Sequence, residues 1–239
     1  MKTTFKDRTE AGRLLARRLG EYARNPQAIV LALPRGGVPV GHAVAQALQL
    51  PLDVLVVRKL GVPGHDELAF GAIAGGGVEL LNSEIVESYG LSGRSIAAVA
   101  RRETIELTRR ETIYRGSRPA PAIRGRTVLL VDDGIATGAS VRVALLALRH
   151  RGAATIVVAA PVIAPDTQAA LAAEADRIVA VLLPQDFAGV GEWYDDFSQT
   201  TDEEVQRLLA DAAVPAEVAT NFAHKSPSPA KPGTGPGLD

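Results

Sequence analysis

The chain has 239 residues, 46% of them hydrophobic, which is enough to bury the core of one large domain or two small ones. Lys and Arg (26) nearly balance Asp and Glu (27), and the net charge of −1 excludes a broad basic surface for nucleic acid or an anionic membrane. Without cysteine there is no disulfide, thiolate metal site or cysteine nucleophile. The start lacks an apolar signal region and no apolar run could span a membrane, so we expect a cytoplasmic protein.

Short apolar segments alternate with helical patterns along most of the chain. Strands are predicted at residues 28–33, 52–57, 128–131, 154–160 and 177–183. Helices are predicted to begin near residues 9 and 40, and at residues 92–114, 141–149, 166–173 and 202–212. Five apolar strands with helical crossovers predict an α/β fold with a mostly parallel five-stranded sheet and helices on both faces.

The turn after the first predicted strand carries Arg35, Gly36 and Gly37. Two glycines let the backbone bend sharply and approach a ligand, and the guanidinium of Arg35 is a planar fork suited to phosphate oxygens. Paired glycines after a strand are also common in ordinary turns. The segment therefore supports a phosphate site only together with a second signal.

A basic pair and a glycine-rich segment follow the second predicted strand. Lys59 would lie at the carboxyl end of that strand, where it could meet a phosphate or form a solvated edge. Residues 61–81 contain many glycines and weak strand runs, which predict a mobile β-ribbon. Acids and bases are interleaved in the helix at residues 92–114, and this favours a solvated helix that projects from the core or packs on a partner subunit.

The second signal lies in residues 128–140, where an apolar strand ends in Asp132 and Asp133 and is followed by small residues and a helix. A bare loop and a helix N-terminus direct several N–H groups at one point, which suits a phosphate. The two carboxylates would repel that phosphate, so they suit sugar hydroxyls or a hydrated Mg²⁺. A ribose that carries a 5′-phosphate and a metal-bound polyphosphate would supply the phosphate for the N–H groups and the hydroxyls and metal ion for the carboxylates. The alternative is that the acids only cap the helix.

Residues 128–140 resemble the signature of the type I phosphoribosyltransferases. Together with residues 34–39, they resemble a bacterial phosphoribosyltransferase-like branch that also occurs attached to α/β-hydrolase domains, although the Gly-x-Ser-x-Gly elbow of such hydrolases is absent here. The resemblance implies a phosphoribosyltransferase-like domain over residues 1–212, with a flexible lid at about 60–82 and a small hood at about 184–200. Residues 213–239, rich in Pro, Gly and Ser, are predicted to be a disordered tail.

The resemblance also implies a reaction, in which the 5-phosphoribosyl group of phosphoribosyl pyrophosphate moves to a nucleobase-like acceptor and pyrophosphate leaves. Mg²⁺ would be the cofactor, held by Asp132 and Asp133 through water. Catalysis would fall to Asp132, Asp133, Lys59 and Arg35. The 5′-phosphate loop would comprise Gly134, Ile135, Ala136, Thr137, Gly138 and Ser140, and the pyrophosphate loop Arg35, Gly36 and Gly37. Candidates in the lid are His65 and Glu67, and candidates in the acceptor hood are Phe187, Trp193 and Tyr194, aromatic residues that could equally fix the C-terminal helix to the core.

The acceptor is less well defined. Members that use 6-oxopurines have an acid where this chain has Ala136, and a later lysine that reads the base; after Lys59 the only lysines here are Lys225 and Lys231. A 6-oxopurine is therefore disfavoured, and adenine, a pyrimidine or another acceptor stays open. Two other functions also stay open: a non-catalytic sensor of phosphoribosyl pyrophosphate or a nucleotide, and a phosphohydrolase. We expect small-molecule partners, no nucleic-acid or membrane partner, and consider a homodimer.

Overall fold

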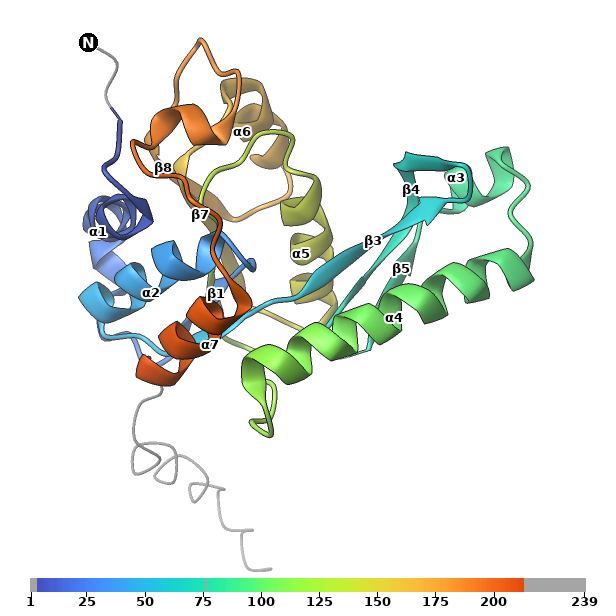
Figure 1. The fold of residues 1–239 in the computed structure, drawn as a ribbon, viewed down its shortest axis with the longest axis horizontal. Coiled ribbons are helices and arrows are strands. Elements are labelled where there is room, and N and C mark those ends of the chain that lie inside the picture. Colours follow the sequence, from blue (N-terminus) through green and yellow to red (C-terminus); the bar gives the residue numbers. More distant parts are fainter. Residues whose placement is uncertain (1–3, 76, 213–239) are drawn as a thin grey trace, which may run out of the picture.

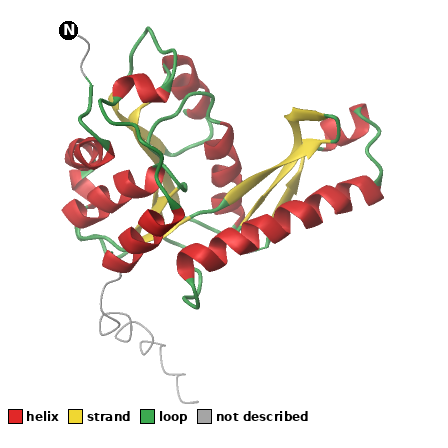
Figure 2. Ribbon diagram, in the orientation of Figure 1, coloured by secondary structure: helices red, strands yellow, loops and turns green. Residues whose placement is uncertain are grey.

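The computed structural model describes residues 4–75 and 77–212, drawn in Figure 1 and coloured by secondary structure in Figure 2. The tail predicted at residues 213–239 lies outside the described residues. The helices are α1 (Arg8–Arg18), α2 (Gly37–Leu48), α3 (Ser83–Ser88), α4 (Gly93–Arg115), α5 (Ala139–His150), α6 (Pro165–Leu171) and α7 (Asp202–Asp211), with 3-10 turns η1 (Gly20–Tyr22) and η2 (Val190–Trp193). In the described part of the chain, no helix combines the length and the apolar character needed to cross a bilayer.

A parallel sheet of five strands forms the body of the molecule. Its strands are β1 (Ala28–Ala32), β2 (Leu52–Val54), β6 (Thr127–Val131), β7 (Thr155–Val162) and β8 (Arg177–Leu182), in the order β2-β1-β6-β7-β8. Ala32 pairs with both Val54 and Val131, so β1, β2 and β6 end at the same level. The loops after β1 and β6 leave the sheet side by side, at the point where the strand order reverses and where ligands bind in such sheets.

Helices cover both faces of this sheet, as the sequence predicted. Alternate side chains of β6 point to opposite faces. Leu129 and Val131 join a core formed with α1, α2 and α7, whereas Val128 and Leu130 join a core formed with α5 and α6. The central strands are buried on both sides, which explains why their sequences are continuously apolar rather than alternating.

A second sheet and two helices project from the body, and we call residues 57–115 the arm (Figure 1). The arm contains the antiparallel strands β3 (Val57–Val62), β4 (His65–Ala74) and β5 (Val78–Leu81), with α3 and the long helix α4. The prediction of a single core strand at residues 52–57 is wrong, because β2 ends at Val54 and β3 begins at Val57 in another sheet. The parallel pairing stops there because β1 ends at Ala32, so no strand remains for residues beyond Leu55 to pair with.

The base of α4 is fixed to the body by buried polar contacts. Arg115 donates from Nε to Asp53 Oδ1 of β2 at 3.0 Å and from Nη2 to the carbonyl oxygen of Val54 at 2.5 Å. The hydroxyl of Tyr114 donates to Asp202 Oδ1 of α7 at 2.8 Å. These contacts set the position of α4 relative to the end of β2, so side chains along α4 face the carboxyl edge of the parallel sheet.

Candidate functional site

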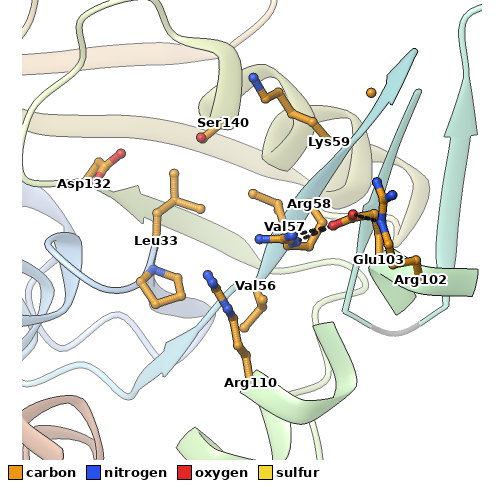
Figure 3. Close-up of a pocket in the computed structure, with 12 residues that line it drawn as sticks. Leu33, Val56, Val57, Arg58, Lys59, Arg102, Glu103, Arg110, Asp132 and Ser140 are labelled. Atoms are coloured by element: carbon orange, nitrogen blue, oxygen red, sulfur yellow. Dashed lines mark hydrogen bonds and ion pairs between the residues drawn. The ribbon is translucent and has the colours of Figure 1, made fainter. Parts of the chain in front are cut away.

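A cavity of about 650 Å³ separates the carboxyl edge of the parallel sheet from the arm, and we call it the central cavity (Figure 3). Its volume lies in the range of small-molecule sites. The side chains that line it are those of Leu33, Pro34, Val56, Val57, Arg58, Lys59, Arg102, Glu103, Arg110, Asp132 and Ser140, together with Gly61. Asp132 and Ser140 lie on the sheet side and the cations on the arm side, so the two walls differ in charge.

The loop at residues 132–140 presents bare backbone to this edge. Gly138 has a φ of 71°, a left-handed conformation that favours glycine, and it is the residue before the first turn of α5. Ala136, Thr137, Gly138 and Ser140 donate no backbone hydrogen bond to another residue of the described chain. With the positive end of the α5 dipole behind them, these N–H groups have the arrangement that suits a phosphate.

The two adjacent acids have different surroundings. Asp132 lines the central cavity, and burial, followed by the charge of Asp133, raises its pKa well above the ordinary value. Asp133 faces the other way, where its Oδ2 accepts a hydrogen bond of 2.9 Å from Arg8 Nε. The guanidinium of Arg8 also donates to the carbonyl oxygen of Ser198 at 2.7 Å and stacks 4.0 Å from the ring of Phe197. Only Asp132 therefore presents its carboxyl group to the cavity.

The glycines after β1 are required by the acidic loop beside them. A Cβ on Gly36 would lie 2.0 Å from Asp133 Oδ2, and one on Gly37 would lie 2.8 Å from the carbonyl oxygen of Val131. Leu33 and Pro34 line the cavity, but the Arg35 side chain extends toward α7, where its Nη1 lies 3.9 Å from Asp202 Oδ1. The backbone of this loop thus reaches the site, whereas the guanidinium of Arg35 does not lie among the groups that line it.

Lys59 does reach the cavity, although it lies on β3 rather than at the end of a core strand. It lines the cavity from β3 of the arm, and Ser140, which belongs to the first turn of α5, lines it from the sheet side (Figure 3). Lys59, Asp132 and Ser140, three of the side chains that the sequence singled out, are therefore brought together. They come from β3 and from the loop between β6 and α5, and the fold supplies the proximity.

Three arginines of the arm complete the wall. Arg58 Nε donates to Glu103 Oε2 at 2.8 Å and Arg102 Nε to Glu103 Oε1 at 3.0 Å. Burial would raise the pKa of Glu103, but the hydrogen bonds from both arginines lower it, so the carboxylate stays ionised. Arg110 enters the cavity from the next turns of α4 (Figure 3).

Sequence reasoning missed Arg102, Glu103 and Arg110 as site residues because the interleaved charges of residues 92–114 were interpreted as a solvated helix. Arg58 belongs to the basic pair after the second predicted strand, of which only Lys59 was assigned to the site. One signal was available. Val99, Glu103 and Leu107 recur at helical spacing and share the buried face of α4. An acid in an apolar stripe needs a partner, and that partner is Arg58 of β3.

Of the two lid candidates, His65 is not among the residues that line the cavity. His65 is exposed, lies at the start of β4 beside the turn from β3, and packs its ring edge-on against Tyr89 with centroids 5.6 Å apart. Glu67 belongs to β4, but its side chain is outside what the structure describes. Their assignment to the site stays a prediction.

The hood candidates belong to one apolar cluster, against which Phe187 packs. Trp193 and Tyr194 are buried in a cluster with Phe5, Ala11 and Val162, so they pack against the N-terminal segment and β7. The hydroxyl of Tyr194 donates to the carbonyl oxygen of Asp133 at 2.5 Å, and burial followed by the charge of Asp133 raises the pKa of that hydroxyl. Phe187 and Trp193 line a second cavity of about 650 Å³ together with Gln185, Asp186, Ala188 and Glu192. Val190 of this segment lies against Gly134, so the hood covers the acidic loop.

The described residues contain no group of three or more His, Asp or Glu side chains placed to hold a metal ion. Asp132 supplies a single carboxyl group to the cavity, because Asp133 is paired with Arg8. This donor set fits an Mg²⁺ ion that receives most of its oxygen ligands from a substrate and from water. It does not fit an ion bound by protein side chains alone.

The fold and the site define a parallel α/β protein with a loop of bare backbone N–H groups at the switch point of its sheet and a cationic wall opposite. The chain belongs to the phosphoribosyl transferase domain family, whose sequence profile matches residues 5–195. This confirms the resemblance found in the sequence.

Relatives of known structure and sequence agree with this assignment. The crystal structure of TT1426 from Thermus thermophilus is 42% identical, covers 90% of this chain and 100% of that one, and superposes with a TM-score of 0.79. Two curated proteins of Mycobacterium tuberculosis, from strains CDC 1551 / Oshkosh and ATCC 25618 / H37Rv, are each 47% identical over 205 residues and are provisionally named phosphoribosyl transferases. The match covers 86% of this chain but only 46% of either relative, so the chain spans less than half of their length.

Proposed function

We propose that this domain transfers the 5-phosphoribosyl group of phosphoribosyl pyrophosphate to an acceptor that carries a nucleophilic ring nitrogen. The nitrogen forms a bond to the anomeric carbon, and the bond from that carbon to the pyrophosphate oxygen breaks with its electron pair leaving on pyrophosphate. The observation that carries the proposal is that Asp132, Lys59 and Ser140 line one cavity beside the bare N–H groups of residues 136–140. The chemistry of these groups supports one place for a phosphate, one for a ribose and one for a polyanion.

Each part of the substrate has a partner of matching chemistry. The N–H groups of residues 136–140 and the hydroxyls of Thr137 and Ser140 would hold the 5′-phosphate. Asp132 would accept hydrogen bonds from the ribose hydroxyls, and Lys59 would neutralise charge on the departing pyrophosphate. Bound Mg²⁺, held by Asp132 through water, would supply further charge neutralisation on the pyrophosphate oxygens. The contribution of the protein is then mostly positioning and electrostatic stabilisation.

The acceptor would enter from the hood side. Tyr194 and Arg8 hold Asp133 from that side, and Val190 packs on Gly134, so the hood closes directly over the loop that would hold the ribose. Ala136 is exposed, has no side chain that could take a proton, and its carbonyl oxygen accepts from Thr167. Ala136 therefore cannot act as a base toward the acceptor. This supports an acceptor that does not have to lose a proton to residue 136, and it disfavours a 6-oxopurine.

A turnover screen tests the proposal. The protein is incubated with Mg²⁺, phosphoribosyl pyrophosphate and pooled nitrogen heterocycles, and mass spectrometry detects a phosphoribosylated product with release of pyrophosphate. The Asp132→Asn/Asp133→Asn variant is the control and should lose the product. Tight binding without any product would instead identify a sensor, and release of inorganic phosphate from substrates without a 1-pyrophosphate would identify a phosphohydrolase.

A further inference from the structure

The arginine expected to meet pyrophosphate is directed elsewhere. Nη1 of Arg35 lies 3.9 Å from Asp202 Oδ1 at the start of α7, and the same oxygen accepts a hydrogen bond of 2.8 Å from the hydroxyl of Tyr114. The cavity is lined by Leu33 and Pro34 from this loop, but not by Arg35. A guanidinium on the leaving-group side would favour such a transfer, because bidentate guanidinium groups bind phosphate oxygens more strongly than a single ammonium does.

Arg110 of α4 occupies that side. It lines the central cavity, and its guanidinium points toward the space between Leu33 and Arg58 (Figure 3). Its Nε donates to Glu106 Oε1 at 2.7 Å, one helical turn back on α4, and this bond leaves both Nη groups for a ligand. Hydrogen bonds from Arg109 and Arg110 lower the pKa of Glu106 to about 2, so Glu106 is ionised and holds Arg110 in the working pH range.

The position of Arg110 is set by the base of the arm. Arg115, five residues further along α4, is bound to Asp53 and Val54 at the end of β2, so this part of α4 cannot slide along the sheet edge without breaking a buried ion pair. Each arginine of the wall donates to a carboxylate of α4: Arg58 donates to Glu103 from both Nε and Nη2, Arg102 donates to Glu103 from Nε, and Arg110 donates to Glu106 from Nε alone. Arg58 is thus left with one Nη group and Arg110 with two, and the Arg102 side chain is 71% exposed. Arg110 and Lys59 are then the cations best placed to receive a new anion from the cavity.

We propose that Arg110, a residue of the arm rather than of the loop after β1, binds the pyrophosphate group of phosphoribosyl pyrophosphate and stabilises it as it departs. This inference rests on the proposed function and extends it, since it assigns the leaving-group end of the substrate to the arm side of the cavity. The sheet edge would then hold the ribose 5-phosphate half, and the arm would hold the pyrophosphate half.

The chain contains a matched control for this proposal. Arg109 is the neighbouring residue and donates to the same carboxylate, from Nε to Glu106 Oε2 at 2.8 Å, but it does not line the cavity. Its side chain is 53% exposed, against 34% for Arg110. Arg109 donates to Glu106 from both Nε and Nη2, and Arg110 donates from Nε alone. Arg109→Ala and Arg110→Ala therefore remove equal charge and both remove contact with Glu106, but only Arg110→Ala removes a side chain that lines the cavity.

The test is calorimetric titration of each variant with three probes: Mg²⁺ with pyrophosphate, Mg²⁺ with phosphoribosyl pyrophosphate, and ribose 5-phosphate. We expect Arg110→Ala to weaken both pyrophosphate-containing probes about tenfold or more, the effect of losing a charge-assisted bidentate contact. Ribose 5-phosphate has no pyrophosphate group, so it should bind Arg110→Ala with the same affinity as the unaltered protein. Arg109→Ala should change all three by less than about twofold, and Arg110→Lys should recover only part of the lost affinity.

The outcomes separate the inference from the function on which it rests. If the unaltered protein binds phosphoribosyl pyrophosphate and Arg110→Ala binds it equally well, the inference is wrong and the proposed function stands. If Arg110→Ala and Arg109→Ala weaken binding equally, the effect is one of general charge and the inference is again wrong. If the unaltered protein binds no pyrophosphate-containing probe, both fail. Circular dichroism and a thermal melt of each variant confirm that a loss of affinity is not a loss of fold.

Discussion

The two walls of the central cavity are held in place by different forces. On the sheet wall, residues 132–140 follow a strand buried on both faces, and packing with neighbouring strands sets the position of the loop. On the arm wall, polar contacts set the positions of the side chains: Arg115 with Asp53, Arg58 with Glu103, and Arg110 with Glu106. One wall depends mainly on apolar burial, the other mainly on ion pairs.

This difference indicates a division of labour. Burial of apolar strands is insensitive to salt and pH in the ordinary range, and it suits a loop whose backbone N–H groups must keep a fixed geometry. The buried pair of Arg115 with Asp53 fixes the base of the arm. The more exposed pair of Arg110 with Glu106 is weaker and responds to charge, which suits a wall that must receive and release a polyanion. Substitutions in the two walls should therefore have effects of different kind and size, with the largest at the base of the arm.

The largest effect should follow from breaking the base of the arm. Arg115 is 6% exposed and its partner Asp53 14%, so Arg115→Met would leave a buried carboxylate without its cation. We expect a loss of about 3–5 kcal/mol in the free energy of unfolding, the cost of removing one member of a buried pair. Urea unfolding measures it, with Arg101→Met on an exposed part of α4 as the control, for which a change within about 0.5 kcal/mol is expected. A loss below about 1 kcal/mol would show that water screens the pair.

Next come the two adjacent acids, which should fail in different ways. Asp132→Asn should lower turnover by about 10²–10³-fold with the fold intact, because it removes the only one of the two carboxylates that lines the cavity. Asp133→Asn should cost about 1–3 kcal/mol of stability, because the buried guanidinium of Arg8 loses its charged partner. Turnover and a thermal melt on both variants check this. Equal losses of turnover with equal melting temperatures would contradict the separation of roles.

The sequence predicted the sheet wall far better than the arm wall. Residues 128–140 carry their own evidence, since an apolar run, two acids and a glycine-rich turn are local features, and the structure places them as a strand, a loop and a helix start. The parallel order and the helices on both faces followed from the count of apolar runs and crossovers.

The arm could not be predicted in the same way because its geometry depends on contacts between distant residues. Lys59 and Arg110 are 51 positions apart in the sequence, and they share a cavity only because β3 leaves the parallel sheet and packs along α4. The direction of Arg35 depends on Asp202, a residue of the last described helix. No local pattern carries either fact.

A smaller effect is expected where the two loops of the sheet wall touch. Gly36→Ala would place a Cβ 2.0 Å from Asp133 Oδ2, so the carboxylate must move away from Arg8. We expect a loss of about 1–3 kcal/mol, typical of overpacking. Gly93→Ala, where no heavy atom lies within 4 Å of the added Cβ, is the control and should be nearly neutral. If both variants unfold at the same urea concentration, the loops are less tightly packed than described.

The raised pKa of Asp132 gives a pH dependence of defined sign. A carboxyl group whose pKa is higher in the folded protein binds its proton more tightly there, so stability falls as the pH rises from the ordinary carboxyl range through the raised pKa. Each tenfold difference in proton affinity between the folded and unfolded protein corresponds to about 1.4 kcal/mol. Asp132→Asn should abolish this slope and unfold at higher urea than the unaltered protein at about pH 8. Parallel pH profiles for the two proteins would mean that Asp132 has an ordinary pKa.

The smallest effect separates the arm from the body. Ser92 Oγ caps α4 by accepting a hydrogen bond of 3.1 Å from the N–H of Ser95, and Thr201 Oγ1 caps α7 in the same way from Glu204. Each cap is worth about 1 kcal/mol. Thr201→Ala should lower the global free energy of unfolding by that amount, because α7 packs on the main core through Val205 and Leu209.

Ser92→Ala should instead speed hydrogen exchange only in the first turns of α4, because that end of the helix lies on the projecting arm and can open without the body. A Ser92→Ala variant whose global stability falls as much as that of Thr201→Ala would show that the arm and the body unfold together, and the contrast between the two walls would then concern their chemistry alone.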